Sequence, residues 1–317
     1  MGEVLGRGRE VTVEAAYAAC RVIAKREAKN FYYSFRVLPQ TKSDAMCAVY
    51  AFMRKADDLA DDEAFSVDAR RTAMTEWLGA WRAARAGGAT DDPVFAALGD
   101  AQRRFAISDE LLEDLVRGTT LDLEERQEGV APVVVKGETY QVYETFEGLY
   151  RYCYLVASVV GLVCIKVFGY SDPAAERLAE ETGIAFQLTN ILRDVKEDAE
   201  RGRVYLPLDD MRKAGSDVEQ IVVASDDGVV GHGVKFLMVH EGDRAKAYYR
   251  SAEALLPMID PDSRAALWVM VTIYRRLLEK IAAKGYPVTR RVSLSTVTKL
   301  SILARGALMT RRLRAVR

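Results

Sequence analysis

Residues 183–198 read GIAFQLTNILRDVKED, and this stretch decides the fold class. Apolar residues recur around it at helical spacing, which predicts a helix over residues 172–200. Its amide and carboxylate side chains fall at spacings of three, four and four and form one polar stripe: Gln187, Asn190, Asp194 and Asp198. A stripe that combines amides with carboxylates, directly after an apolar turn, is unusual for a helix face that only meets water.

A second acidic stretch, RKADDLADD, covers residues 54–62 inside another expected helix. Asp57 and Asp61 lie four residues apart, so they share one face of that helix. Arg54 and Tyr50 lie on the same stripe, about one and two turns upstream of Asp57. The alternative for either acidic stretch taken alone is a solvated helix face.

These carboxylate pairs need compensating charge, because like charges at this spacing repel each other by a few tenths of a kcal/mol. Oxygen ligands without histidine or cysteine favour Mg²⁺, which combines carboxylates with water and substrate phosphate oxygens. Aspartates on two helices could hold several Mg²⁺ ions, which would neutralise a diphosphate as its C–O bond breaks. Asn190 and Gln187 could ligate or orient these ions. Arg54 and Arg193 could bind phosphate oxygens directly.

The composition excludes several classes of protein. The chain has 317 residues, of which 50% are hydrophobic, and 45 basic residues balance 46 acidic ones. Such a chain can bury a large core, and its balance of charge argues against disorder and against a general nucleic-acid-binding protein. The two histidines, His232 and His240, are too few for a histidine-rich metal site and leave few partners for a Ser/His/Asp nucleophile.

Helical periodicity dominates and predicts an all-α fold with one domain over residues 1–317. Helices are expected at residues 41–62, 66–86, 108–119, 145–168, 172–200, 235–256 and 260–284. Residues 130–143 are the one strand-like piece and predict a small hairpin with Lys136-Gly137 as its turn. Residues 87–92 and 215–233 are expected to be loops, because glycine and aspartate cluster there.

The cysteines and the longest apolar run bear on location. No CxxC pair is present, so we expect small buried thiols in a reducing cytoplasm: Cys20, Cys47, Cys153 and Cys164. No signal-peptide pattern opens the sequence. The longest apolar run, Cys153–Ile165, has 13 residues. A membrane span needs about 20, so a buried core helix and a cytoplasmic location are expected.

The two acidic stretches resemble the signatures of the squalene/phytoene synthase family. The matching motifs are Asp57–Asp61, Gln187–Asp198 and the RGRVYLP of residues 201–207. Further pieces that fit are residues 30–39, 48–52, 152–157, Tyr274 and 290–299. The resemblance covers nearly the whole chain, from about Val13 to Arg305.

The resemblance implies the isoprenoid synthase fold, which is all-α around a central cavity, and Mg²⁺-dependent head-to-head condensation of two allylic prenyl diphosphates. Mn²⁺ would be a substitute metal. One substrate ionises to an allylic cation, and the double bond of the other attacks it to give a cyclopropylcarbinyl diphosphate. After a second ionisation the product cation loses a proton, as in phytoene synthases, or takes a hydride from NADPH, as in squalene synthases.

The resemblance also implies roles for single residues. Asp57 and Asp61 would bind metal at one diphosphate. The metal ligands at the other diphosphate would be Asn190, Asp194 and Asp198. Substrate contacts would come from Gln187 and, on phosphate oxygens, from Arg54, Arg193, Arg291 and Lys299. Tyrosines near the reacting carbons or the leaving group would be Tyr50, Tyr205 and Tyr274.

Aromatic rings would stabilise an allylic cation by roughly 0.5–2 kcal/mol each, inside a cavity dry enough to keep water from quenching it. The candidates are Phe31, Phe35 and Phe52. For each of them, packing in the hydrophobic core is the alternative. The substrate is either geranylgeranyl diphosphate, which gives phytoene, or farnesyl diphosphate, which gives squalene, presqualene diphosphate or dehydrosqualene. We favour the phytoene type.

The chain departs from the family pattern at two places. Ala28 stands where some relatives have a phosphate-contacting serine, which puts that contact in doubt. Residues of about 127–142 form an insertion where many relatives join the flanking segments directly. We hypothesise that the inserted hairpin is a lid or rim over the cavity, and a surface excursion without a role is the alternative.

The C-terminal segment is strongly basic. Residues 290–317 contain eight basic residues, no acidic residue, and several interleaved leucines. The tail of about residues 305–317 would then contact anionic lipid at the inner face of the membrane, where a water-insoluble product must go. The alternative is a docked helix with a solvated basic tail, and the sequence leaves the oligomeric state open.

Two further functions compete with the condensation. A terpene cyclase of the same fold would act on one prenyl diphosphate, but cyclases usually carry a different second metal motif. A catalytically silent lipid-binding or assembly subunit would commonly lose aspartates from one motif. The full set is present here, which favours an active enzyme: Asp57, Asp61, Asn190, Asp194 and Asp198.

Overall fold

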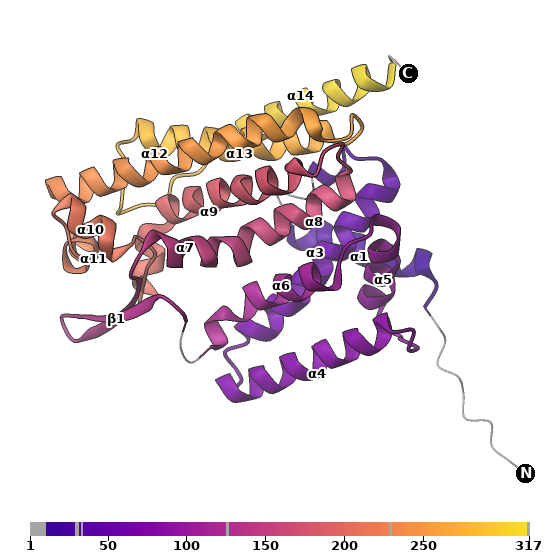
Figure 1. Cartoon of the computed structure of the whole chain (residues 1–317), viewed down its shortest axis with the longest axis horizontal. Coiled ribbons are helices and arrows are strands. Elements are labelled where there is room, and N and C mark those ends of the chain that lie inside the picture. The colour runs from indigo at the N-terminus through magenta and orange to yellow at the C-terminus, as the bar shows by residue number, and fades with distance from the viewer. Residues whose placement is uncertain (1–10, 29–31, 33, 125–126, 228–229, 316–317) are drawn as a thin grey trace, which may run out of the picture. The chain divides into compact units, whose positions relative to one another are not determined.

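The computed structural model describes residues 11–28, 32, 34–124, 127–227 and 230–315 (Figure 1). The chain forms two compact units, one from Met1–Glu124 with Lys166–Gly169 and one from Glu125–Ile165 with Tyr170–Arg317. Helices make up most of both units, which confirms the all-α prediction, and the second unit also contains a small sheet.

The first unit contains α1 (Val13–Glu27), α3 (Gln40–Asp61), α4 (Val67–Arg85), α5 (Pro93–Phe105), α6 (Asp109–Thr120) and the 3-10 turn η1 (Leu121–Leu123). Four of these helices begin where a side chain accepts a hydrogen bond from a backbone N–H of the first turn: Thr12, Ser66, Asp92 and Ser108. α3, α4 and α6 begin and end within one residue of the expected bounds. α1 and α5 are additional to the expected helices.

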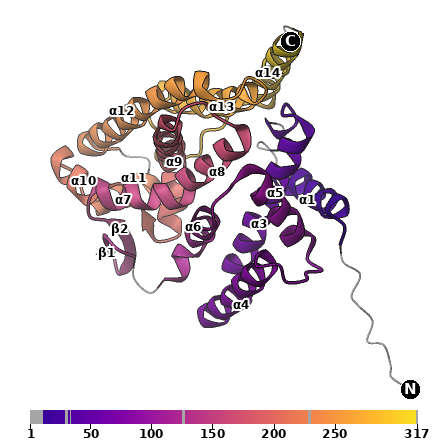
Figure 2. The same ribbon diagram turned by 45° about the vertical axis from the view of Figure 1, so that its right-hand side comes forward.

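In the first unit α3, α4 and α5 are neighbours (Figure 2), and an aromatic cluster packs between them. The ring of Phe52 lies 4.7 Å from that of Trp77 and 5.3 Å from that of Trp81, and both tryptophans also contact Phe95. Phe52 is fully buried. Because tryptophan rings cover the Phe52 side chain, the structure supports packing in the hydrophobic core rather than contact with an allylic cation.

The second unit contains the hairpin strands β1 (Val130–Val135) and β2 (Glu138–Tyr143), α7 (Phe146–Cys153), the π-helical turn η2 (Tyr154–Ser158), α8 (Val159–Phe168), α9 (Ala174–Glu200), β3 (Arg203–Val204), α10 (Leu208–Ala214), α11 (Val218–Asp227), α12 (His232–Leu255), the 3-10 turn η3 (Leu256–Met258), α13 (Arg264–Ala283) and α14 (Thr296–Ala315). The last residues of α8 belong to the first unit. Figure 1 shows α9 beside α12 and α13, and these neighbours cover the helix that carries the second acidic motif.

α9 and η2 approach each other backbone to backbone. A Cβ atom on Gly183 would lie only 2.5 Å from the Cα atom of Ser158, so no other residue fits there without a shift. The Ser158 hydroxyl donates to the carbonyl oxygen of Glu180 at 2.7 Å and ties the π-helical turn to α9. This close crossing fixes the position of α9 within the unit.

The helix Phe146–Phe168, which includes α7, η2 and α8, is long and apolar enough to cross a membrane by length and composition. Half of its most apolar window is buried inside the protein. Core helices of soluble proteins pass the same test. All four cysteines are free and buried, as expected, and burial raises the pKa of Cys20 and Cys47 to about 12.

The expected hairpin is present and its turn is the predicted one. β1 and β2 pair antiparallel from Val135↔Glu138 to Val130↔Tyr143. Lys136 and Gly137 both have positive φ, 51° and 89°, which matches the right-handed twist of the flanking strands. The sequence does not indicate the third strand, β3, which pairs parallel with β2.

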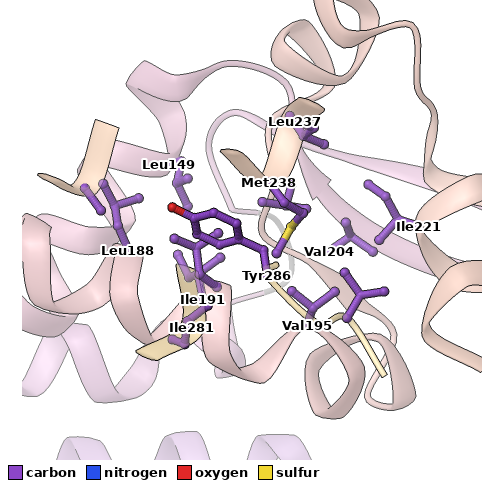
Figure 3. Packing of buried hydrophobic residues seen from close by; sticks show 14 of the residues in the cluster. Leu149, Leu188, Ile191, Val195, Val204, Ile221, Leu237, Met238, Ile281 and Tyr286 are labelled. Atoms are coloured by element: carbon purple, nitrogen blue, oxygen red, sulfur yellow. The ribbon is translucent and has the colours of Figure 1, made fainter. Parts of the chain in front are cut away.

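The hydrophobic core of the second unit gathers side chains from almost every element (Figure 3). Leu188, Ile191 and Val195 enter it from α9, and Val204 enters it from β3. Because one side of α9 is committed to this core, its polar stripe is left to face the other way. Met238 and Tyr286 lie in the same cluster from α12 and the segment after α13.

The prediction that residues 215–233 form a loop is wrong. α11 occupies Val218–Asp227, and the Asp217 carboxylate accepts from the N–H of Gln220 at its start. The apolar residues at helical spacing, Val218, Ile221 and Val222 among them, are buried. The acidic patch suggested a loop, but Ser225 and Asp226 are the last turn of this helix. Gly228 and residue 229 lie outside the described residues.

Candidate active site

The first acidic motif lies in the last turns of α3. Asp57 is half-buried and Asp61 is exposed, one helical turn further on. Burial, followed by repulsion from Asp61, raises the pKa of Asp57 to about 6. The C-terminal end of a helix is its negative pole, and no basic residue lies in the last turn of α3. This end of α3 therefore favours a bound cation.

The other residues of the first motif lie where the spacing predicts them. Arg54 forms an ion pair with Asp58, and its charge also lowers the pKa of Asp57 in part. Burial raises the pKa of Tyr50, although Arg54 opposes the shift. Phe35 is buried. Phe31 lies outside the described residues.

The second acidic motif begins with an amide pair on α9. The Asn190 side-chain N–H₂ donates to the Gln187 oxygen at 3.1 Å, so the two expected neighbours on the stripe do meet. Asn190 Oδ1 is buried and has no hydrogen-bond partner among the described residues. Burying an oxygen without a hydrogen-bond donor costs free energy. This atom would therefore be stabilised by a bound cation or by a hydrogen bond from a substrate.

Asp194 distorts α9. Its φ of −108° and ψ of 16° are not helical, although no proline is nearby. The Nε atom of Arg193 donates to one of its carboxylate oxygens at 2.7 Å, and Arg291 Nε lies 3.0 Å from the same oxygen. The irregular turn of α9 therefore lies where two arginines bond the same carboxylate.

Asp198 lies one turn beyond Asp194, near the end of α9. Burial, followed by repulsion from Asp194, raises the pKa of Asp198 to about 7, although Arg201 and Arg203 lower it. No basic residue lies in the last turn of α9 itself. Both acidic motifs therefore combine an aspartate whose pKa is raised by burial and by a second carboxylate with the negative end of a helix, and added positive charge there would be favourable.

Tyr274 and Tyr205 are both close to the second motif. The Tyr274 ring stacks on Phe186 at 4.4 Å and 11°. Burial raises the Tyr274 pKa, and the charge of Arg193 and a hydrogen bond with Asn190 oppose the shift, which places the hydroxyl beside the motif. Tyr205 stacks on Tyr152 at 4.9 Å, and Arg203 donates to the Tyr205 hydroxyl at 3.3 Å.

The structure thus brings together most of the residues expected at the second diphosphate: Gln187, Asn190, Arg193, Asp194, Asp198, Tyr274 and Arg291. Lys299 lies half-buried in the first turn of α14. Three neighbours were not expected at the site: Tyr152, Phe186 and Arg203. Arg203 and Tyr152 stand inside motifs that the resemblance marks, but their spacing along the chain does not reveal the contact.

The family profile described as Squalene/phytoene synthase matches residues 24–298 of this chain. The chain belongs to the squalene/phytoene synthase family. The phytoene synthase of Mycobacterium bovis is 34% identical over 293 residues, which cover 92% of this chain and 90% of that protein. The chain is a prenyltransferase of the squalene/phytoene synthase type.

Solved structures of the family share the fold. A dehydrosqualene synthase in complex with a ligand matches with a TM-score of 0.77 at 28% identity, over 95% of this chain and 98% of that one. The squalene synthase HpnC from Alicyclobacillus acidocaldarius matches with a TM-score of 0.74 at 27% identity, over 87% of this chain and 97% of that one. The expected isoprenoid synthase fold is thereby confirmed.

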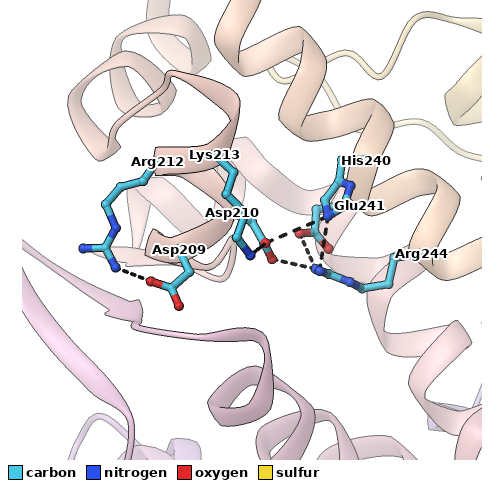
Figure 4. A network of polar contacts seen from close by, with 7 residues as sticks. All are labelled: Asp209, Asp210, Arg212, Lys213, His240, Glu241 and Arg244. Atoms are coloured by element: carbon cyan, nitrogen blue, oxygen red, sulfur yellow. Dashed lines mark hydrogen bonds and ion pairs between the residues drawn. The ribbon is translucent and has the colours of Figure 1, made fainter.

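A third acidic group lies in α10 and α12 of the second unit (Figure 4). Oxygen or nitrogen atoms of Asp210, His240 and Glu241 lie within 4.8 Å of one another, a spacing that could hold a cation. Arg244 already bonds Asp210 at 2.8 Å and Glu241 at 2.6 Å, and Lys213 bonds Asp210 at 3.0 Å. Two basic side chains balance two carboxylates, so this group is an ion-pair network between helices.

The family uses divalent metal ions, and the two aspartate motifs fit one better than the third group does. Their candidate ligands are all oxygen atoms, as Mg²⁺ prefers. Asn190 Oδ1 has no hydrogen-bond partner among the described residues. The raised pKa values of Asp57 and Asp198 both result in part from a second carboxylate nearby, and added positive charge would relieve that repulsion.

Proposed function

We propose that this protein condenses two geranylgeranyl diphosphates head to head into phytoene, in a reaction that depends on Mg²⁺. The second motif is the main support, because one half-buried group contains an unpartnered amide oxygen, aspartates and arginines. Those groups suit a metal-bound diphosphate. The identity to phytoene synthases of about a third supports the C20 substrate.

Each motif binds one diphosphate in this proposal. Asp57 and Asp61 hold metal at the first diphosphate, where Arg54 binds phosphate oxygens. The ligands at the second diphosphate are Asn190, Asp194 and Asp198, with Gln187 orienting Asn190. Its phosphate contacts are Arg193, Arg291 and Lys299. When bound, the metal ions would supply the positive charge that makes diphosphate a good leaving group.

The tyrosines of this chain act on the reacting carbons and the leaving group. Tyr274 lies against Asn190 and Arg193, and its aromatic stack on Phe186 excludes water from that side. Tyr205 is held between Tyr152 and the Arg203 guanidinium, which orients its hydroxyl. Tyr50 takes the corresponding place at the first motif. In this proposal Phe35 lines the hydrocarbon part of the substrate.

The alternative within the same chemistry is condensation of two farnesyl diphosphates. The dehydrosqualene synthase and squalene synthase structures support it, because this chain shares their fold. The products would be presqualene diphosphate, dehydrosqualene or, with NADPH as hydride donor, squalene. NADPH belongs only to this alternative.

Product analysis separates these functions. Purified protein with Mg²⁺ is incubated with geranylgeranyl or farnesyl diphosphate, each with and without NADPH, and the extracts are identified by mass spectrometry. We expect a C40 hydrocarbon without NADPH. C30 material from farnesyl diphosphate supports the alternative, and no coupled product beside an active control enzyme contradicts both and favours a cyclase or a silent subunit.

We also propose that the C-terminal segment contacts anionic lipid from the cytoplasm. Val297, Leu300 and Leu308 of α14 are exposed, while Ile302 is buried. Truncation after Arg305 is expected to abolish co-sedimentation with anionic vesicles. Phe236→Ser, which removes an exposed aromatic ring on α12, is the matched control and should bind as before. Unchanged binding of the truncated protein would contradict the proposal.

A further inference from the structure

The β1–β2 hairpin lies alongside the segment that follows the second motif. The backbone N–H of Gln141 donates to the carbonyl oxygen of Gly202 at 2.8 Å. Gln141 pairs with Arg203 and Val142 pairs with Val204 in parallel register. At the far end, the N–H of Asp209 donates to the carbonyl oxygen of Glu144 at 3.1 Å. Residues 202–209 are therefore tied to the hairpin at both ends.

The close approach depends on the smallest residue at the start of this segment. Gly202 has a φ of +71°, and a Cβ there would lie 3.2 Å from the carbonyl oxygen of Thr139. Positive φ and this lack of space both favour glycine. The side chain of Val204 enters the hydrophobic core and anchors residues 202–209 to it (Figure 3).

Tyr143, the last residue of β2, adds a side-chain contact. Its ring lies 6.1 Å from that of Tyr205 at 21°, and 5.6 Å from that of Tyr152. Its hydroxyl donates to Gln127 at 3.0 Å, and the side chain is almost fully buried. Tyr205 thus belongs to a cluster of three rings, the other two of which come from the hairpin and from α7.

The direction of the strand bonds separates the two faces of the hairpin. Because the Gln141 N–H faces β3, its antiparallel partner Pro132 lies at a position without cross-strand hydrogen bonds, where proline loses nothing. Val134 is two residues further along β1, so its N–H also faces away from β2. The outer edge of β2 pairs with β3, whereas the outer edge of β1 does not.

We propose that the hairpin is a positioning element of the catalytic site: β2 and Tyr143 hold Arg203 and Tyr205 in the place where they act on the second diphosphate. Arg203 is the basic residue that reaches both the Tyr205 hydroxyl and the charge of Asp198. This inference rests on the proposed function. Val142 and Tyr143, at the end of β2, are buried, and the hypothesis that the hairpin is a lid or rim stays a prediction beside this inference.

The test compares two proline substitutions in one hairpin. Gln141→Pro removes the N–H that bonds Gly202, while Val134→Pro removes an N–H that faces away from β2. We expect Gln141→Pro to speed amide hydrogen exchange over residues 201–206 and to lower kcat/KM by about 10–100-fold. Val134→Pro should leave both near wild type. Tyr143→Ala should change exchange and kcat/KM in the same direction as Gln141→Pro. Tyr143→Phe should keep kcat/KM near wild type, because it preserves the contact between the aromatic rings.

Several outcomes would overturn the inference. Unchanged exchange over residues 201–206 in Gln141→Pro would mean that β2 does not order the segment. Faster exchange with unchanged kcat/KM would mean that the order serves only stability. If Gln141→Pro fails to fold, the Tyr143→Ala and Tyr143→Phe pair decides the matter in the same way.

A binding measurement separates this inference from the proposed function. The Mg²⁺-dependent affinity for a non-reactive geranylgeranyl thiolodiphosphate is measured for each variant. If wild type binds the analogue but forms no coupled product, the proposed function fails, and weaker binding by Gln141→Pro alone still supports positioning. Equal binding by both proline variants, together with equal turnover, contradicts it.

Discussion

The two aspartate motifs carry similar residues on differently built helices. In α3 the backbone is regular, Asp61 is exposed, and the ion pair of Arg54 goes to Asp58 rather than to an expected metal ligand. In α9 the helix is distorted at Asp194, and that aspartate is bonded by Arg193 and Arg291. In the second motif two arginines therefore bond a candidate metal ligand directly, whereas in the first motif Arg54 pairs with a neighbouring aspartate.

This difference suggests a division of labour between the diphosphates. A motif with prebuilt arginines binds a phosphate group with both metal and direct hydrogen bonds. A motif with a single arginine relies more on metal, so its affinity for diphosphate should follow the metal concentration more steeply. Substitutions of single residues test this difference between the two motifs.

The largest effect is expected from removing one metal ligand in either motif. Asp57→Asn and Asp194→Asn should each lower kcat by about 10³-fold, because the charge that stabilises the leaving group is lost. Steady-state kinetics at saturating Mg²⁺ measures this. Asp62→Asn, at the exposed end of α3, is the control and should be nearly as active as wild type. If only one motif proves sensitive, the two-site account is wrong.

The framework under the second motif should tolerate little added volume. Gly183→Ala is expected to lower the free energy of unfolding by about 1–3 kcal/mol or more, because its Cβ would collide with Ser158. Gly79→Ala in α4 has open space around its Cβ, so it should raise stability by about 0.5–1 kcal/mol. Urea denaturation compares the two, and equal effects would contradict the close crossing of α9 and η2.

The two arginines that bond Asp194 should contribute differently to the free energy of unfolding. Arg193 is mostly buried, whereas about half of the Arg291 side chain is exposed. Arg193→Gln should therefore lower the free energy of unfolding by about 1–3 kcal/mol, and Arg291→Gln by under about 1 kcal/mol. Thermal denaturation of the metal-free protein checks the order. A larger loss from Arg291→Gln would refute it.

The smallest expected effect is a difference in stability between variants of Asp198 and variants of Asp194, which Arg193 and Arg291 bond. The folded-state pKa of Asp198 is raised to about 7, so without metal the protein loses stability as pH rises from about 4 to 7. Asp198→Asn should remove this loss and stabilise the metal-free protein at neutral pH by about 1–2 kcal/mol after solvent screening. Asp194→Asn should destabilise it, because two arginines lose their partner.

Denaturation in EDTA at pH 5 and pH 7.5 would test this sign. Wild type should lose stability between the two pH values by more than Asp198→Asn does. A stability gain for Asp194→Asn, or a loss for Asp198→Asn, would mean that the two aspartates are not balanced as described.

Much of the second motif could be predicted from the sequence because helical spacing alone places Gln187, Asn190 and Asp194 on one stripe. The contact of Asp194 with Arg291 could not, since Arg291 lies about a hundred residues later in the sequence. The hairpin turn could be predicted because Lys136-Gly137 has the right chemistry. The two-residue strand β3 is too short to produce any period.

The failures have physical causes as well. α11 was hidden by the acidic residues of its last turn, although its apolar spacing was helical. The stack of Tyr143, Tyr152 and Tyr205 joins three elements, so no local pattern reveals it. The single-domain prediction remains a prediction, since the described residues group into two compact units.

The central claim is that each motif binds its own prenyl diphosphate. Isothermal titration of the protein with a non-reactive geranylgeranyl thiolodiphosphate in excess Mg²⁺ tests it directly. The account predicts two analogues per chain for wild type, and one for Asp57→Asn and for Asp194→Asn. A stoichiometry of one for wild type would contradict it and support a cyclase that acts on a single substrate.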